Sequence, residues 1–202
     1  MKLRALRAAA AAALVLTAVP AAAQQFSDSY EFLEAVRKSD GTKVAKFLQD
    51  KSLRIVNAKD RGTGEGAMHI VARRSDALYL RALLQADDAN PNIQDRRGNT
   101  PLLVAIEQNW EEGVTILLRY NANPNVANSG GETPLIRAVQ MHNDEIVRRL
   151  LAAGANPDKA DFGSGKSARD YAREATRWPA IAKMLADAPK GGSGAASTGP
   201  RL

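Results

Sequence analysis

Residues 98–102, Gly-Asn-Thr-Pro-Leu, recur at 131–135 as Gly-Glu-Thr-Pro-Leu. Two further marks keep the same interval: a Leu-Leu pair at 117–118 and 150–151, and an Ala-Asn-Pro triplet at 122–124 and 155–157. Chance seldom aligns three separate marks on one period, which indicates a chain built from repeated structural units. Because a single short unit cannot bury its own apolar face, neighbouring units must stack and supply one another's core.

Weaker copies of the unit extend the pattern in both directions. Residues 66–72, Gly-Ala-Met-His-Ile-Val-Ala, begin one such unit. The distance along the chain from Gly66 to Thr100 is one residue longer than that from Thr100 to Thr133. Ser167 begins another, which follows Thr133 by the same longer interval. Apolar residues at helical spacing between 30 and 48 indicate one further, degenerate unit. We therefore predict a repeat domain over residues 30–187, with approximate units at 30–60, 61–95, 96–128, 129–161 and 162–187.

The residue types at each mark suit helices joined by turns. Thr100 and Thr133 each precede a proline, and a Thr side chain can accept a bond from an unpaired N–H of the first helical turn. Proline suits the next position because its φ is already helical and its missing N–H costs nothing there. Pro179 is expected to start the last helix in the same way, and Gly154 to follow a helix in a left-handed turn.

These motifs resemble ankyrin repeats, which have a period of about 33 residues and the signature Thr-Pro-Leu-His-x-Ala. Residues 100–105 match the signature at every position except His, and residues 133–138 depart at the same place. Residues 66–71 keep His69, which the resemblance implies is a structural hydrogen-bonding residue, but lack Thr-Pro. The resemblance implies an all-α fold, a solenoid of about five helix-turn-helix units with β-hairpin loops.

The first residues have the pattern of a secretory signal. Three basic residues lie within positions 1–7, an apolar stretch occupies 8–19, and Ala-Ala-Ala closes the region at 21–23. The apolar stretch is too short to span a bilayer comfortably. We therefore predict a signal peptide at 1–23, cleaved near Ala23, and no stable membrane insertion afterwards. The composition of this signal suits a bacterial envelope, which predicts a periplasmic or secreted protein.

Two polar segments flank the predicted repeats. Residues 24–29 lead into the first unit, and Ser27 or Asp28 is expected to cap its first helix. Residues 188–202 are rich in Gly, Ser and Ala and have no apolar period, so we predict a disordered tail there.

The charge of the chain does not mark it as a nucleic-acid-binding protein. The formal net charge is +6, and three of the basic residues would leave with the signal peptide. Aromatic residues make up only 5% of the sequence and no Lys/Arg run is present, so a basic surface with aromatic side chains for base stacking is not expected. There are no cysteines, so packing alone must hold the fold in an oxidising compartment.

The sequence offers no recognisable set of catalytic or metal-binding residues. His69 and His142 are its only histidines, and neither has a carboxylate at ligand spacing. Residues 163–167, Gly-Ser-Gly-Lys-Ser, match only the end of a phosphate-binding loop, whose first glycine would fall on Ala160. We therefore predict no catalysis, no cofactor and no metal, and a small-ligand or catalytic role is the less favoured alternative.

The candidate site that remains is a protein-binding surface. By resemblance, ankyrin domains bind partners with their hairpin tips and the exposed side of their first helices, which line a concave face. Arg and Trp often anchor such interfaces. On the helices this pattern selects Arg73, Arg74, Glu107, Gln108, Trp110, Arg137, Gln140 and Met141, and at the tips it selects Lys59, Arg61, Arg96, Arg97, Asn128 and Phe162.

Together these features predict an exported, monomeric ankyrin-repeat scaffold that binds a partner protein through its concave face. An inhibitor, immunity or stress-protective partner of an envelope enzyme would use the same mechanism of binding. The sequence does not separate this alternative from the first interpretation.

Overall fold

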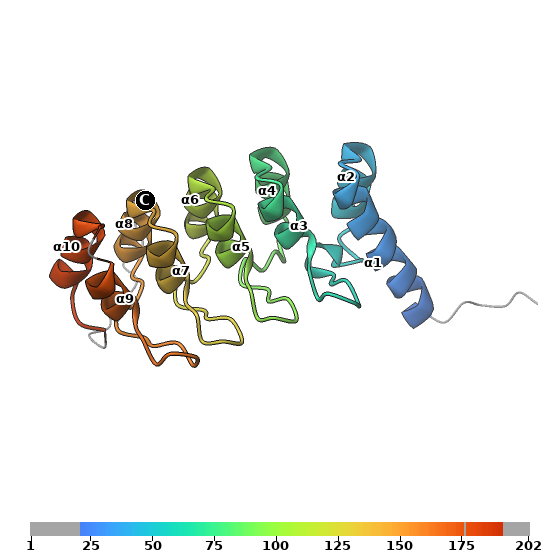
Figure 1. The fold of residues 1–202 in the computed structure, drawn as a ribbon. Coiled ribbons are helices and arrows are strands. Elements are labelled where there is room, and N and C mark those ends of the chain that lie inside the picture. The colour runs from blue at the N-terminus through green and yellow to red at the C-terminus, as the bar shows by residue number, and fades with distance from the viewer. Residues whose placement is uncertain (1–20, 176, 192–202) are drawn as a thin grey trace, which may run out of the picture.

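The computed structural model describes residues 21–175 and 177–191. This part of the chain forms five pairs of α-helices that stack side by side into an elongated solenoid (Figure 1). The pairs are α1 (Ala21–Arg37) with α2 (Gly41–Gln49), α3 (Ala67–Arg73) with α4 (Ala77–Leu84), α5 (Pro101–Glu107) with α6 (Glu111–Arg119), α7 (Pro134–Gln140) with α8 (Asp144–Ala152), and α9 (Ala168–Glu174) with α10 (Pro179–Asp187). The predicted all-α repeat solenoid is therefore confirmed.

The helices form two layers, and hairpin loops project from one edge of the stack (Figure 1). The first helices of the pairs pack in order from α1 to α9, and the second helices pack in order from α4 to α10. A short 3-10 helix, η1 (Ile55–Asn57), follows α2. Hairpins 1 to 4, as we name them, are closed by antiparallel backbone contacts at residues 59–66, 95–99, 128–132 and 160–167.

The starts of α5 and α7 have the predicted caps. The hydroxyl of Thr100 accepts a hydrogen bond from the N–H of Leu103 at 3.3 Å, and that of Thr133 accepts one from Ile136 at 3.2 Å. Pro179 lies in the first turn of α10, as expected.

The expected cap at Ser27 or Asp28 is wrong. Helix α1 begins at Ala21 and already includes both residues in its interior. The Ala and Gln residues that precede them favour the helical state, so the helix extends backward past both polar residues.

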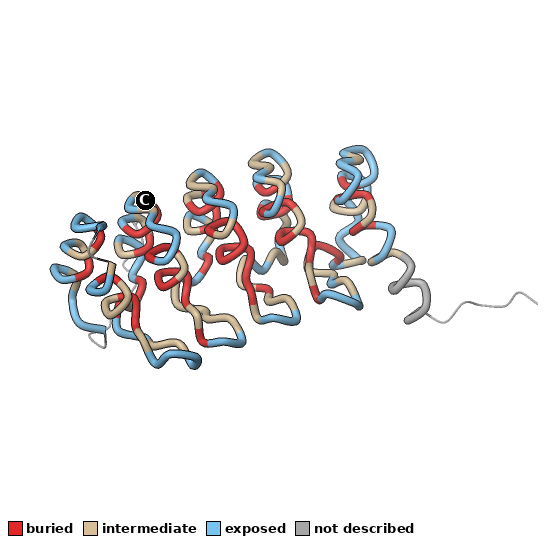
Figure 2. The backbone as a smooth tube through the Cα atoms, viewed as in Figure 1, coloured by how far each residue is buried: buried red, intermediate tan, exposed pale blue. Residues whose placement is uncertain are grey.

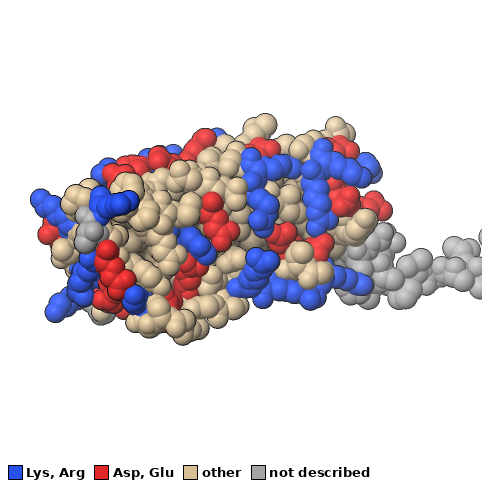
Figure 3. Space-filling model, viewed as in Figure 1, with Lys and Arg blue, Asp and Glu red and all other residues tan. Residues whose placement is uncertain are grey.

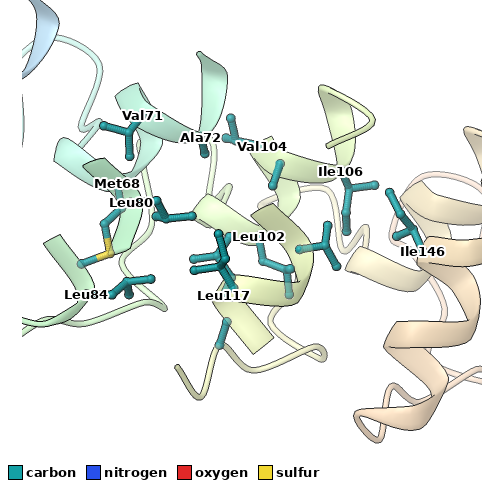
Figure 4. Packing of buried hydrophobic residues seen from close by; sticks show 14 of the residues in the cluster. Met68, Val71, Ala72, Leu80, Leu84, Leu102, Val104, Ile106, Leu117 and Ile146 are labelled. Carbon is teal, nitrogen blue, oxygen red and sulfur yellow. The ribbon is translucent and has the colours of Figure 1, made fainter. Parts of the chain in front are cut away.

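The core runs without interruption along the stack, as the buried segments of each unit in Figure 2 show. The first residue of each Leu-Leu pair, Leu117 and Leu150, is fully buried. The second residue of each pair is half-buried against the same core. In Figure 4 the side chains of Leu80, Leu102 and Leu117 point into the space between the second and third units. Stacking of neighbouring units therefore supplies the interior that each unit lacks alone.

The predictions for the two ends fall mostly outside the described residues. Residues 1–20 of the predicted signal peptide (1–23) and residues 192–202 of the predicted tail (188–202) are not among them. Where the tail is described, the N–H of Gly191 donates to the carboxylate of Asp158 at 2.7 Å. No helix within residues 21–175 or 177–191 is both long and apolar enough to cross a membrane.

Candidate protein-binding surface

The tips of the four hairpins are joined into one edge by backbone hydrogen bonds. The tips of hairpins 2, 3 and 4 each donate one N–H to a carbonyl of the preceding tip: Arg96 to Thr63 at 3.0 Å, Ser129 to Arg97 at 2.9 Å and Phe162 to Gly130 at 2.8 Å. These bonds run between consecutive units, in the way that a β-ladder joins neighbouring strands. The side chains on the tips are therefore held on a connected backbone rather than on independent loops.

Within each hairpin a short polar side chain organises the turn by accepting backbone N–H groups. The acceptors are Asp60, Asp95, Asn128 and Asp161. The N–H groups of Thr63 and Gly62 and the guanidinium of Arg37 lower the pKa of Asp60 to about 2. The hydroxyl of Tyr171 contributes most to lowering the pKa of Asp161. In hairpins 1, 2 and 4 the acceptor is therefore a carboxylate that faces its own backbone, and in hairpin 3 it is the amide oxygen of Asn128.

Close approach between tips explains one glycine. Gly131 has φ +78°, and a Cβ built on it would lie 2.7 Å from the backbone nitrogen of Phe162. The ring of Phe162 covers the same glycine, yet the residue as a whole is 78% exposed. Only a residue without a side chain fits under this tip.

The two arginines predicted at hairpin 2 lie together on its exposed tip. The guanidinium of Arg96 donates to the backbone carbonyl of Arg61 on hairpin 1. Within the described part of the chain, the side chain of Arg97 makes no hydrogen bond or ion pair. The predicted residue Phe162 lies at the other end of the row, on hairpin 4.

The two arginines at the end of α3 differ in their exposure and in the groups that they bind. Arg73 is exposed and pairs with Glu65. Arg74 is half-buried, and its guanidinium donates to the carbonyl of Val36 at 2.5 Å and to Asp76 at 3.1 Å. Arg74 therefore joins the first unit to the second, and both terminal nitrogens of its guanidinium are already bound.

Arg137 lies at the centre of a small charge cluster between α5 and α7. Its guanidinium lies 2.5 Å from a carboxylate oxygen of Glu132 and 3.6 Å from one of Glu107. All three side chains are less than one-third exposed. The two predicted residues Glu107 and Arg137 are thus brought together, and they compensate each other's charge.

Gln108, Gln140 and Met141 are exposed where α5 and α7 end. Trp110 does not lie on the exposed side of a first helix, where the repeat pattern predicted it. It precedes α6, and its half-buried ring packs so closely over Gly113 that no Cβ would fit there. The ring therefore covers the first turn of α6.

The two histidines lie in different parts of the fold. His69 is fully buried, its Nδ1 accepts the N–H of Gly66 at 3.1 Å, and its Nε2 lies 2.9 Å from the carbonyl oxygen of Asn99. Because Nδ1 accepts, Nε2 carries the proton and donates. His69 thus joins the second unit to the third, and its burial lowers its pKa. His142 is exposed and stacks on Trp178 at 4.7 Å between ring centroids.

Hairpin 4 contains the Gly-Ser-Gly-Lys-Ser segment, and the N–H groups of its residues 164–167 already have acceptors. Asp161 accepts the N–H groups of Ser164 and Gly165 at 2.7 and 3.2 Å. A phosphate would need such N–H groups, and here a carboxylate already holds them. Within the described residues, no group of three His, Cys, Asp or Glu side chains is placed to hold a metal ion.

Sequence reasoning missed a ladder of asparagines in the segments that lead from the second helices to the hairpins. Side-chain oxygens of one unit accept backbone N–H groups of the next: Asn57 from Asn90 at 2.9 Å, Asn92 from Asn123 at 2.7 Å and Asn125 from Asn156 at 2.7 Å. The repeated Asn-Pro-Asn at 90–92 and 123–125 was the available signal.

The described surface is hollowed along the hairpins and between α2 and α4. The hollow along the hairpins, of about 500 Å³, is lined by Arg97, Asn128, Ser129, Gly130, Glu132, Asp161, Gly163, Ser164 and Tyr171. The hollow between α2 and α4, of about 540 Å³, has an apolar floor that includes Leu48, Ile55 and Ala82. It forms where α2 stands apart from α4, unlike the closely packed second helices that follow.

Comparison with known proteins identifies the repeat. A family model described as "Ankyrin repeats (3 copies)" matches residues 32–128 and 68–161. Neurogenic locus notch homolog protein 4 of Homo sapiens is 47% identical over 58 residues, which are 29% of this chain and 3% of that protein.

Two further relatives give similar short matches. Nuclear factor NF-kappa-B p110 subunit of Drosophila melanogaster is 37% identical over 54 residues, 27% of this chain and 6% of that protein. Neurogenic locus notch homolog protein 1 of Mus musculus is 44% identical over 63 residues, 31% of this chain and 2% of that protein. The chain thus spans only a small part of each relative. The family model, in contrast, matches more than half of this chain, which therefore belongs to the ankyrin-repeat family.

Proposed function

We propose that this chain is a non-catalytic scaffold that binds a partner protein on its hairpin face. By hairpin face we mean hairpins 1 to 4 together with the exposed ends of α3, α5, α7 and α9. Repeat proteins of this class commonly use such extended surfaces to bind other proteins.

The observation that carries the proposal is the connected row of hairpin tips. Backbone bonds join the tips, and the face carries exposed side chains, such as Arg97 and Gln140, that make no hydrogen bond or ion pair with the described residues. A surface that is already ordered loses little conformational entropy on binding. Phe162, 78% exposed at the last tip, adds an aromatic side chain of the kind that anchors interfaces.

We also propose that the protein is exported to the periplasm or beyond. The support is the sequence of residues 1–23, with its basic head, short apolar stretch and Ala-Ala-Ala end. Cell fractionation with N-terminal sequencing of the mature protein tests this. A mature N-terminus near Gln24 in the periplasmic or extracellular fraction is expected, and a cytoplasmic protein that retains Met1 would contradict it.

Partner binding can be tested with two matched double variants. Gln108→Arg with Gln140→Arg adds bulk and charge to the hairpin face, at exposed positions on two neighbouring units. Gln49→Arg with Ala152→Arg does the same on exposed positions of the second helices. The partner would first be identified by cross-linking and mass spectrometry with the wild-type protein in envelope extract.

The affinity of the identified partner then decides the question. We expect the first double variant to weaken binding about tenfold or more, because a buried mismatch at an interface costs well over 1 kcal/mol. The second should bind as the wild type does. Equal binding by the wild type and the first variant would exclude the hairpin face as the site.

A further inference from the structure

Basic side chains gather on hairpins 1 and 2. Figure 3 shows Lys and Arg along the edge formed by these hairpins, and uncharged residues over much of the edge beyond them. The cations of the two hairpins are Lys59, Arg61, Arg96 and Arg97. Glu65, the one glutamate of hairpin 1, is paired with Arg73 of the adjoining helix α3.

Within the described residues, the two aspartates of the same hairpins form no ion pair with these four cations. Asp60 is bound by the guanidinium of Arg37 at 2.8 Å. Asp95 faces its own turn and accepts the N–H groups of Arg97 and Asn99, each at 2.8 Å. Both carboxylates are therefore bound by groups other than the side chains of the four cations.

Two of the cations bind only neutral groups of the protein. The ammonium of Lys59 donates to the backbone carbonyl of Gln94 at 2.6 Å, and the guanidinium of Arg96 donates to that of Arg61. A carbonyl fixes the position of a cation without cancelling its charge. Across residues 21–175 and 177–191, Lys59, Arg96 and Arg97 form no ion pair. The carboxylate of Asp95 offsets only one of these three charges, so the two hairpins keep an excess of positive charge.

Hairpins 3 and 4 lack this excess of positive charge. The tip of hairpin 3 is Asn128, Ser129, Gly130 and Gly131, which carry no charge. On hairpin 4, Lys166 is balanced by Glu174 at 2.8 Å. The positive charge is therefore confined to one end of a connected edge.

We propose that hairpins 1 and 2 bind an acidic segment of the partner protein, with carboxylates placed against Arg96, Arg97 and Lys59. This inference rests on the proposed function and adds the chemistry and position of the contact. Complementary charge speeds encounter and selects among partners, and fixed cations lose little freedom on binding. The exposed aromatic Phe162 lies two hairpins away, so the basic patch does not provide the stacking rings that single-stranded nucleic acids use.

A pair of charge-matched variants isolates the patch. Arg96→Glu with Arg97→Glu reverses two cations on hairpin 2. Lys43→Glu with Lys46→Glu reverses two exposed cations on α2, so the change in net charge is identical. The probe is a fluorescein-labelled peptide of alternating Glu and Ser, measured by fluorescence anisotropy with the full chain. A Gln-Ser peptide serves as its neutral counterpart.

We expect the Glu-Ser peptide to bind the wild type in a salt-sensitive way, and the Gln-Ser peptide to bind at least about tenfold more weakly. The Arg96→Glu/Arg97→Glu variant should lose about tenfold or more in affinity, and the Lys43→Glu/Lys46→Glu variant about twofold or less, because distant charges are screened. Arg97→Glu alone should weaken binding in the same direction, and since its side chain makes no bond within the described chain, this variant should keep the fold.

Three results would overturn the inference: no binding of the Glu-Ser peptide, equal losses in the two double variants, or tighter binding of a single-stranded DNA of equal charge. The failure of this inference is distinguishable from the failure of the proposed function. If the partner binds the wild type and the Arg96→Glu/Arg97→Glu variant equally but is lost by Gln108→Arg/Gln140→Arg, the function stands and the acidic contact does not.

Discussion

The side-chain oxygen of Asn125 accepts a hydrogen bond from the backbone N–H of Asn156 at 2.7 Å, so a residue of the third unit fixes the backbone of the fourth. The amide nitrogen of Asn125 donates to the carbonyl of Gly154 at 2.9 Å in the same contact. The units are therefore joined by directed polar bonds between the segments that precede the hairpins, in addition to the shared apolar core.

Replacing Asn125 with Ala should destabilise the fold. The change removes two hydrogen bonds at partly exposed groups, which costs about 0.5–1.5 kcal/mol in the free energy of unfolding for each bond. Urea denaturation followed by circular dichroism measures it. Gln140→Ala removes a side chain of similar polarity that is exposed, and should change stability by less than about 0.5 kcal/mol. Equal effects of the two substitutions would contradict the role given to Asn125.

Two glycines with similar backbone angles should respond differently to alanine. Gly154 has φ +85° and nothing within 4 Å of the position that a Cβ would take, so Gly154→Ala should cost only the backbone strain, about 1–2 kcal/mol. Gly131 has φ +78° and the backbone of Phe162 at 2.7 Å, so Gly131→Ala should cost more. Thermal melts of both variants compare the costs. A Gly131→Ala protein as stable as Gly154→Ala would show that the tips are not held together as described.

The sign of the Gly113→Ala effect should depend on Trp110. In the wild type a Cβ at Gly113 collides with the indole ring, so the substitution should destabilise the protein. In a Trp110→Asn background the ring is gone, and Ala should then stabilise α6 by about 0.5–1 kcal/mol, the usual gain over Gly within a helix. Asn at this position matches Asn143, which caps α8. The same sign in both backgrounds would refute the contact.

Stability should fall as the pH drops below about 6.5, the usual pKa of a free histidine. Burial lowers the pKa of His69, against smaller opposing effects of Asn99, Asp95 and Glu65. Above about pH 6.5 the imidazole of His69 is neutral in both the folded and the unfolded state, and its full contribution to the free energy of unfolding is present. Below about pH 6.5 the unfolded chain binds a proton more readily than the folded protein does, so the free energy of unfolding falls.

Urea denaturation between about pH 7.5 and pH 5 checks the sign and the residue. A His69→Gln variant should be less stable but should lose this part of the pH dependence. His142→Gln should keep it, since His142 is exposed. An unchanged slope in His69→Gln would assign the effect to other groups.

The fold could be predicted from the sequence because its signals are local and repeated. Thr100, Pro101 and the Leu-Leu pairs each specify a cap, a first turn or a core position, and the constant repeat period orders them in space. The start of α1 was misplaced because Ser27 and Asp28 are good caps that also tolerate a helix interior.

The candidate site was less predictable because the use of a side chain depends on its neighbours in the next unit. Arg74 and Arg97 are equivalent in chemistry, but only the structure shows that Arg74 binds the carbonyl of Val36 whereas Arg97 faces solvent. Trp110 resembled an interface anchor, and its contact with Gly113 became visible only when α6 was in place.

The central claim, that the partner contacts the hairpin face, is tested most directly by site-specific photocrosslinking in intact cells that express the protein. A benzophenone amino acid would replace Gln140 at the end of α7 or Ala152 at the end of α8, two exposed positions of the same unit on different layers. We predict that the probe at 140 cross-links a partner protein and that the probe at 152 does not. Cross-linking from 152 with none from 140 would contradict the account.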